Sequence, residues 1–244
     1  MPQSLIKCFV LLVGLGTAHQ AVAQAATTPY PNMAPVEQYL MDRTAEITLA
    51  RSAAPESVSR DAEVQVLGRK GYETAVKGKS GFVCMVERAW MGPLDWPEFW
   101  NPKVRAAVCL NPQAAHSMLP ITYLRTRMVM AGRSRPEIVS ALKAAFENRH
   151  LPNLESGAMS YMMSKSAYLT DEGHHNGPHL MFYTLVKNSK DWGSGAAGSP
   201  VQSSPYWVSS PQDESQLKGL PPILVFIVGV RNWSDGTPAE HHAE

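Results

Sequence analysis

Alternation of apolar and polar residues predicts three short strands in the first third of the chain. Over residues 62–67, Val64 and Val66 alternate with Glu63 and Gln65, a period of two that is typical of a half-buried strand. Residues 72–76 and 82–86 are strand-like too, and glycine-containing turns at 68–71 and 78–81 separate the three segments. Two close turns between short strands predict an antiparallel meander.

Three segments have helical periodicity instead. Apolar residues recur at helical spacing over 36–50 and, less regularly, over 113–131, where Pro120 interrupts the pattern. A better helix begins at Ser134, an N-cap residue with Glu137 three positions later and an apolar stripe that runs to Phe146.

Strand signals return in the last third of the chain. We expect strands over residues 158–163, 179–186 and 206–208, with loops rich in Gly, Ser and Pro over 187–205 and 209–222. Residues 223–230 are nearly all apolar and β-branched, which predicts a central strand buried on both faces.

The order of elements predicts an α+β fold, a mostly antiparallel sheet with helices grouped on one face. We expect a single domain over residues 36–235, preceded by a flexible lead-in over 24–35 that is rich in Ala, Thr and Pro. A polar, disordered tail is expected over 236–244. Residues 89–112, which carry three tryptophans and four prolines, are expected to be irregular.

The first 23 residues have the pattern of a cleavable signal peptide. Lys7 precedes a short apolar run, and Ala21-Val22-Ala23 has the small residues that signal peptidase requires. The apolar run is too short to cross a bilayer as a helix. We therefore expect an exported protein, periplasmic or secreted; the alternative is an N-terminal membrane anchor.

Export leaves two cysteines, because Cys8 lies in the signal peptide. An even pair in an oxidising compartment predicts a disulfide between Cys84 and Cys109 that ties the irregular segment to the third strand. The alternative is a pair of buried free thiols.

Charge excludes one class of partner. Without Lys7, 21 of the 22 basic residues remain and equal the 21 acidic residues, so the expected mature chain has no net charge. A nucleic-acid-binding protein normally shows a basic surplus or stripe, and we expect no nucleic-acid partner. No later segment is long and apolar enough to span a membrane.

One loop concentrates groups that bind metals or transfer protons. Residues 171–179 hold Asp171, Glu172, His174, His175 and His179, and imidazole and carboxylate groups suit both a divalent metal and acid–base chemistry. His179 opens a strand, which makes it the candidate catalytic residue; the metal candidates are His174, His175, His179 and Asp171. The favoured interpretation is simpler, a solvated polar loop followed by a structural His179.

The aromatic residues Trp90, Trp96, Phe99 and Trp100 also admit two interpretations. Tryptophan is enriched at binding surfaces, but such a cluster more often forms a small core of its own against the sheet. The sequence lacks the HExxH and GxSxG signatures of metal and serine hydrolases. The predicted function is an exported domain that binds a small ligand or a protein partner. The alternative is a hydrolase-like or metal-assisted enzyme centred on His179.

Several short motifs resemble those of a family of uncharacterised secreted bacterial proteins. They include Gly81-Phe82-Val83-Cys84 with Cys109, Tyr161-Met162-Met163-Ser164, and Pro178-His179-Leu180-Met181-Phe182-Tyr183. The resemblance runs from about residue 46 to about residue 234. It implies an exported bacterial protein with two paired cysteines, and it implies no activity, cofactor or catalytic residue.

Overall fold

The computed structural model describes residues 29–173, 177–186, 188–199, 201–209 and 218–239. The expected signal peptide, His174 and His175 therefore lie outside the described residues. The helices are α1 (Arg43–Arg51), α2 (Glu56–Ser59), α3 (Pro112–Ser117), α4 (Leu119–Met130) and α5 (Arg135–Glu147), with 3-10 turns η1 (Val36–Gln38), η2 (Ala89–Met91) and η3 (Ser189–Trp192). The strands are β1 (Glu63–Gly68), β2 (Gly71–Val76), β3 (Val83–Glu87), β4 (Ala106–Leu110), β5 (Met159–Met162), β6 (His179–Leu185), β7 (Gln202–Pro205) and β8 (Ile223–Gly229).

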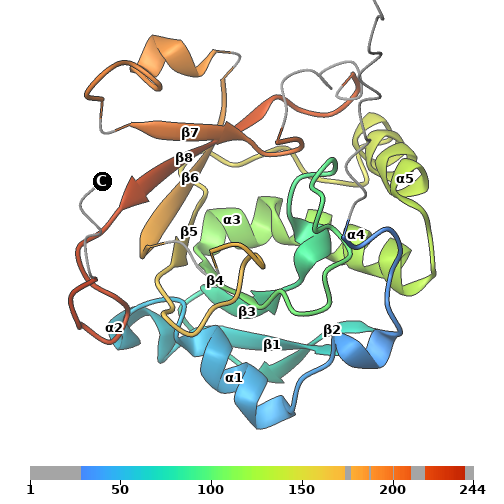
Figure 1. Ribbon diagram of the computed structural model, residues 1–244, viewed down its shortest axis with the longest axis horizontal. Coiled ribbons are helices and arrows are strands. Elements are labelled where there is room, and N and C mark those ends of the chain that lie inside the picture. The colour runs from blue at the N-terminus through green and yellow to red at the C-terminus, as the bar shows by residue number, and fades with distance from the viewer. Residues whose placement is uncertain (1–28, 174–176, 187, 200, 210–217, 240–244) are drawn as a thin grey trace, which may run out of the picture.

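All eight described strands form one open sheet in the order β2-β1-β3-β4-β5-β6-β8-β7. Every neighbouring pair is antiparallel except β1 and β3, which are parallel. The strands follow one another along a curved sheet, and β6 and β8 run obliquely to β1 in the view of Figure 1. The predicted class, a single α+β domain with a mostly antiparallel sheet, is confirmed.

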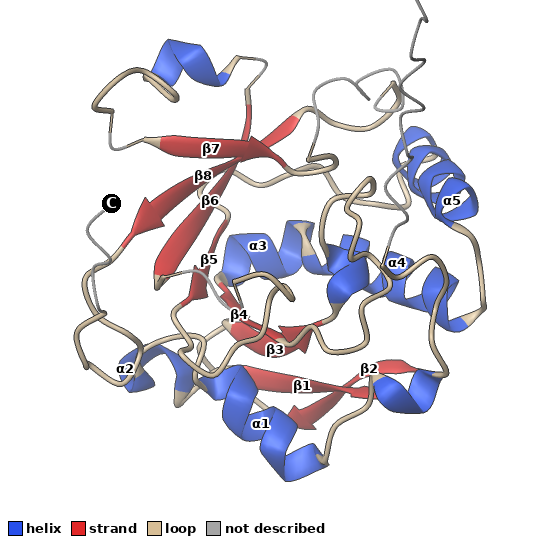
Figure 2. Cartoon of the chain, viewed as in Figure 1, coloured by secondary structure: helices blue, strands red, loops and turns tan. Residues whose placement is uncertain are grey.

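The two faces of the sheet carry different helices. On β3, Val83 and Met85 pack into the larger core with α3, α4 and α5, whereas Cys84 and Val86 pack against Ala50 of α1. Successive side chains of a strand point to opposite faces, so α1 covers one face while α3, α4 and α5 are grouped on the other. Figure 2 shows the separation: α1 lies below β1, whereas α3 and α4 lie above β3 and β4. The grouping on one face that the sequence predicts therefore holds for α3–α5 and not for α1.

The predicted meander is wrong at its third strand. β1 and β2 form the expected hairpin, but β3 pairs with β1 in parallel, Glu63 opposite Val83 and Val64 opposite Cys84. The connection crosses the start of β1 instead of turning back on β2, and the amide N of Lys79 donates to the carbonyl O of Asp61 at 2.9 Å. Gly78 lies so close to the backbone at Glu63 that a Cβ atom would come within 2.0 Å of the Glu63 nitrogen. Only glycine permits this crossing.

The segment expected to be irregular contains a central strand, β4. Its residues Ala106 to Leu110 are all buried, and it pairs with β3 on one side and β5 on the other. Alanine is a weak strand former, and prolines flank the segment. Burial between two strands determines its conformation here.

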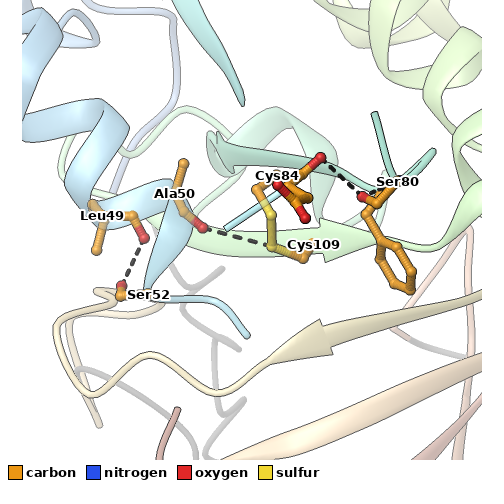
Figure 3. Close-up of a disulfide and its surroundings, with 8 residues drawn as sticks. Leu49, Ala50, Ser52, Ser80, Cys84 and Cys109 are labelled. Carbon is orange, nitrogen blue, oxygen red and sulfur yellow. Dashed lines mark hydrogen bonds between the residues drawn. A yellow bond between two sulfur atoms is a disulfide. The ribbon is translucent and has the colours of Figure 1, made fainter. Parts of the chain in front are cut away.

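The disulfide between Cys84 and Cys109 is present and joins two neighbouring strands, β3 and β4. The two residues are direct partners across the ladder, with Cα atoms 4.0 Å apart. Figure 3 shows the bond beneath α1, where the Cys109 sulfur lies 3.8 Å from the carbonyl oxygen of Ala50. The disulfide therefore fastens the middle of the sheet, rather than tying a loop to its edge.

We expect no free thiol in the mature protein. Labelling of the denatured, unreduced protein should find none, because Cys84 and Cys109 are bonded to each other. After reduction, two thiols per mature chain should react. Two reactive thiols before reduction would contradict the paired state.

The C-terminal strands differ from the prediction in position. β8 is not central, because it is the second strand from the edge of the sheet, with β6 on one side and the edge strand β7 on the other. It is not buried on both faces along its whole length, since Val228 near its end is 46% exposed. The edge strand is Gln202–Pro205, whereas residues 206–208, predicted as a strand, follow it without strand structure. β7 ends at Pro205, which pairs with Leu224, and beyond it the amide of Tyr206 still donates to the carbonyl O of Ile223 at 3.1 Å.

The helix boundaries follow local signals. The expected break at Pro120 separates α3 from α4, with Pro120 in the first turn of α4. α5 starts at the predicted cap, where the amide N of Ser134 donates to the Glu137 carboxylate at 2.8 Å. The helix predicted over 36–50 is shorter: η1 and α1 are separate, and Asp42 caps α1 through the amide of Ala45.

Both ends of the described chain make contacts with the domain. Tyr30 and Met33, in the expected lead-in, pack against the core. At the other end, the amide of Ala239 donates to the carbonyl of Arg231 at 2.8 Å. Within the described ranges, no helix is long and apolar enough to cross a membrane.

Candidate functional site

A cavity of about 380 Å³ lies on the face of the sheet that α4 covers. Strands β3 to β8 supply one side, and the segment from Arg88 to Trp96 together with α4 supplies the other. Its size falls within the range of small-molecule sites. The apolar wall is formed by Met91, Trp96, Val104, Ala106, Leu110, Met118, Met162, Leu169, Met181 and Val225. Four of these are methionines, whose flexible side chains adapt to ligands of irregular shape.

One acidic residue, Glu87, lines this apolar wall. It is the last residue of β3, and strand periodicity places its side chain on the same face as Val83 and Met85. Its partner across the ladder is Ala106, whose small side chain leaves the space beside the carboxyl open to the cavity. β3, whose other residues on this face belong to the core, therefore places one carboxyl group at the cavity.

The surroundings of Glu87 favour its neutral form. Burial raises the pKa of its carboxyl to about 7, and this effect exceeds the opposing effects of Arg125 and of a hydrogen bond with Thr122. The carboxyl is thus poised between its two protonation states near neutral pH. Perturbed carboxyl groups of this kind concentrate at binding and catalytic sites.

Arg125 lies behind the cavity wall and reaches both Glu87 and Tyr206. It is fully buried on α4, and its Nη2 donates to the carbonyl O of Gly92 at 2.5 Å. Burial lowers the pKa of Arg125, and the nearby Tyr206 and Glu87 side chains oppose this effect. The Nε atom of Arg125 is buried and has no hydrogen-bond partner among the described residues. One positive charge therefore stands beside the single cavity carboxyl.

Two tyrosines complete the polar part of the cavity. Burial raises the pKa of Tyr206 to about 12, and it raises the pKa of Tyr183 as well, so both hydroxyls remain protonated at neutral pH. The Tyr183 hydroxyl lies 3.0 Å from the Ser160 hydroxyl. The negative charge of Glu87 also raises the pKa of both tyrosines.

A second charged pair supports the segment that closes the cavity. Nη2 of Arg88 donates to Oε1 of Glu46 at 2.9 Å, and Nε donates to the carbonyl O of Tyr39 at 2.7 Å. The side chains of Arg88 and Glu46 are 0% and 1% exposed. The Arg88 guanidinium therefore has its hydrogen-bond partners outside the cavity. Its ion pair with Glu46 holds the backbone next to Glu87 in place.

The aromatic cluster divides between core and cavity. Trp90, Phe99 and Trp100 are buried in the main core, and the indole N–H of Trp90 donates to the Thr126 hydroxyl at 3.1 Å. Trp96 is only partly buried and lines the cavity. Most of the cluster is therefore core, as favoured from the sequence, and one member faces the cavity.

The structure places His179 in a different environment from the cavity. Its ring is 7% exposed, and Nδ1 lies 2.8 Å from the carbonyl O of Gly177. Burial lowers its pKa. Next to it on the sheet are Met162 and Gly229, neither of which is an acid–base group.

Asp171 accepts hydrogen bonds from a residue three positions before it and from distant parts of the chain. Tyr30 and Tyr168 donate their hydroxyls to it at 2.5 Å, and Lys103 Nζ lies 3.2 Å away. These bonds lower the pKa of Asp171. Among the described residues, no three His, Cys, Asp or Glu side chains gather as a metal site would require. With His174 and His175 outside the described residues, the proposed metal set stays a prediction.

We expect His179 to take no part in any zinc binding by this protein. Its Nδ1 is engaged by Gly177, and its ring is buried. Calorimetric titration with zinc should therefore give the same heat for wild type and for His179→Ala. Heat that appears in wild type and disappears in His179→Ala would restore His179 as a ligand.

Sequence reasoning missed the cavity residues Glu87 and Tyr206, and also Arg125 behind the cavity wall. A signal for Glu87 was present: a carboxylate occupies the inward position of a strand whose other inward residues are Val83 and Met85. For Arg125 the signal was an arginine on the apolar side of α4, where Ile121, Thr122 and Val129 are also buried. Nothing local marks Tyr206, since it follows the edge strand.

No protein-family model matches this chain, and no curated protein or solved structure shows significant similarity to it.

Proposed function

We propose that this protein binds a small, mostly apolar molecule in the cavity beside Glu87. The observation that carries the proposal is a carboxyl group in a mostly apolar cavity of about 380 Å³. Apolar walls with a few convergent polar groups are typical of small-molecule sites. Burial of the Glu87 carboxyl is costly, as its raised pKa indicates, and a bound molecule that hydrogen-bonds Glu87 offsets part of that cost.

The predicted export of the protein agrees with this function. A disulfide in the middle of the sheet suits an oxidising compartment such as the periplasm. We propose that the protein is exported and meets its ligand there. We also propose that the chain belongs to the family of uncharacterised secreted bacterial proteins that its motifs resemble. That resemblance implies no particular ligand.

A neutral fluorescent probe tests the proposal. N-phenyl-1-naphthylamine should bind wild type with a stoichiometry of one and brighten as it leaves water. Leu169→Trp, which fills the cavity from its rim, should abolish this signal. Leu185→Trp is the matched control, because Leu185 lies outside the cavity and is 49% exposed. Equal probe binding by Leu169→Trp and wild type would refute cavity binding.

A second function, general acid–base catalysis, is favoured by one specific observation. The pKa of Glu87 lies near 7 beside a protonated Tyr206, and a carboxyl in this state exchanges protons readily at neutral pH. The enzyme predicted from the sequence, centred on His179, has less support, because that ring bonds Gly177 and does not line the cavity. Turnover of any bound compound that Glu87→Gln abolishes would favour catalysis over binding.

A further inference from the structure

Two residues of the segment that follows β5, Leu169 and Thr170, line the cavity, and Asp171 comes directly after them. We call Leu169 and Thr170 the rim segment. We propose that Asp171 is a positioning residue: its hydrogen bonds hold the rim segment in the cavity wall, and their loss opens a path by which a ligand enters and leaves. This role of Asp171 rests on the proposed function and concerns access to the same cavity.

The two ends of the rim segment are attached in different ways. Before it, Tyr168 exchanges two backbone hydrogen bonds with Arg105, at 2.7 and 3.1 Å. After it, the amide N of Asp171 donates to the side-chain carboxylate of Glu98 at 3.2 Å. The first end is therefore held by backbone on both sides, whereas the second end depends on side chains.

The Asp171 carboxylate connects this second end to several parts of the chain. Oδ2 accepts from the hydroxyl of Tyr30, and Oδ1 accepts from the hydroxyl of Tyr168, each at 2.5 Å. Oδ1 also lies 3.2 Å from Nδ2 of Asn101 and 3.2 Å from Nζ of Lys103. Hydrogen bonds to a charged acceptor are stronger than those between neutral groups. Loss of this carboxylate therefore removes four attachments of the rim segment together.

The attachments of Asp171 lie where water can replace them. Its side chain is 35% exposed, and that of Lys103 is 59% exposed. Other parts of the cavity wall are held by buried groups, such as the ion pair of Arg88 with Glu46. Local opening starts where hydrogen bonds are exposed to solvent and buried contacts are few. We therefore expect the wall to open first at the Asp171 end of the rim segment.

Apolar contact favours the closed position of the rim segment. Leu169 is partly buried and packs against a small cluster that contains Ala89, Val104 and Ala106. This contact is re-formed whenever the loop returns, so opening is expected to be brief and reversible. Segments that open and close in this way control the entry and release of ligands in many proteins.

Labelling of an introduced thiol measures access to the cavity without any ligand. Val225 and Val129 are both buried, but only Val225 lines the cavity, and cysteine is close to valine in size. N-ethylmaleimide, a neutral reagent, should reach Val225→Cys when the wall opens and Val129→Cys only when the core unfolds. Asp171→Ala should speed the labelling of Val225→Cys roughly tenfold or more, as the loss of charged hydrogen bonds gives, and leave that of Val129→Cys unchanged.

Asp235→Ala is the matched control for Asp171→Ala. Asp235 is also an exposed aspartate that accepts several hydrogen bonds, from Lys165 and from Thr237, and it does not line the cavity. This control should leave the labelling of both thiols unchanged. Equal labelling of Val225→Cys with and without Asp171→Ala would overturn the role of Asp171. Equal acceleration at both thiols would overturn it too, because it would show a general loss of stability.

Stopped-flow fluorescence with N-phenyl-1-naphthylamine adds a second measurement on the same variants. Asp171→Ala should raise the association and dissociation rate constants by a similar factor and leave the Kd almost unchanged, because the closed cavity is the same. A raised Kd with an unchanged association rate constant would overturn the role of Asp171 in access. If wild type binds no probe, the proposed function fails, and the labelling rates still decide whether Asp171 keeps the wall closed.

Discussion

Glu46→Ala is expected to lower the free energy of unfolding by about 3–5 kcal/mol, the usual effect of removing one partner of a buried ion pair. Oε1 of Glu46 accepts from Nη2 of Arg88 at 2.9 Å and from the amide of Leu67 at 3.1 Å. Both side chains of the pair are almost fully buried. Without the carboxylate, the Arg88 guanidinium keeps its charge in the core with no counter-charge. Urea denaturation of wild type and variant measures the loss.

Two further variants separate the charge effect from simple truncation. Glu56→Ala removes a glutamate from an exposed pair with Arg60 and should change stability by less than about 0.5 kcal/mol. The double variant Glu46→Ala/Arg88→Met removes both charges and should recover part of the loss. If the Glu46→Ala protein is as stable as the Glu56→Ala protein, the ion pair between Arg88 and Glu46 does not hold α1 to the sheet.

Glu87→Gln is expected to stabilise the protein by about 3 kcal/mol at pH 8 and to change little at pH 4. Burial raises the pKa of Glu87 from 4.5 to about 7, and each pKa unit corresponds to about 1.4 kcal/mol. Between these two values the folded state binds more protons than the unfolded state, so stability falls as pH rises. Below pH 4.5 the carboxyl is neutral in both states and carries no such cost. Glutamine resembles the neutral acid at every pH.

The charged and titratable groups around Glu87 are Arg125 on α4, Tyr183 on β6 and Tyr206 after β7. None of them changes charge between pH 4 and pH 8 in the folded protein, because Arg125 stays protonated and both tyrosines titrate far above this range. Glu73→Gln, at an exposed position, should shift stability equally little at both pH values. A Glu87→Gln effect that is the same at pH 4 and pH 8 would contradict the raised pKa.

Local signals were sufficient for much of the fold. Ser134 and Glu137 mark the start of α5, and Pro120 marks the break before α4, because caps and prolines act within one helical turn. Strand periodicity located β1, β2 and β6 to within a residue or two. The disulfide between Cys84 and Cys109, the two cysteines expected to remain after export, is present.

Non-local contacts account for the errors. The parallel pairing of β1 with β3 depends on the crossing at Gly78, and no periodicity encodes which edge of β1 a later strand joins. β4 is a strand because it is buried between β3 and β5, despite its two alanines. Neighbours in space thus override weak local preference.

The sequence and the structure point to different candidate sites for the same reason. Histidines at 174, 175 and 179 are conspicuous because they are close in sequence, whereas the cavity is lined by Glu87 and Tyr206 from distant segments, with Arg125 behind its wall. Glu87 and Arg125 each carried a local signal, as charged residues among buried apolar ones, and Tyr206 carried none. That Glu87 lies near Arg125 could be learned only from the three-dimensional structure.

We infer that the cavity beside Glu87 holds a small apolar molecule. Anomalous scattering of bromine, in crystals of the protein soaked with 2-bromonaphthalene, tests this most directly. We expect one strong bromine peak inside the cavity, among Met91, Met118 and Met181, and no such peak in Leu169→Trp crystals. A fully occupied bromine site elsewhere, with the cavity free of bromine, would contradict it.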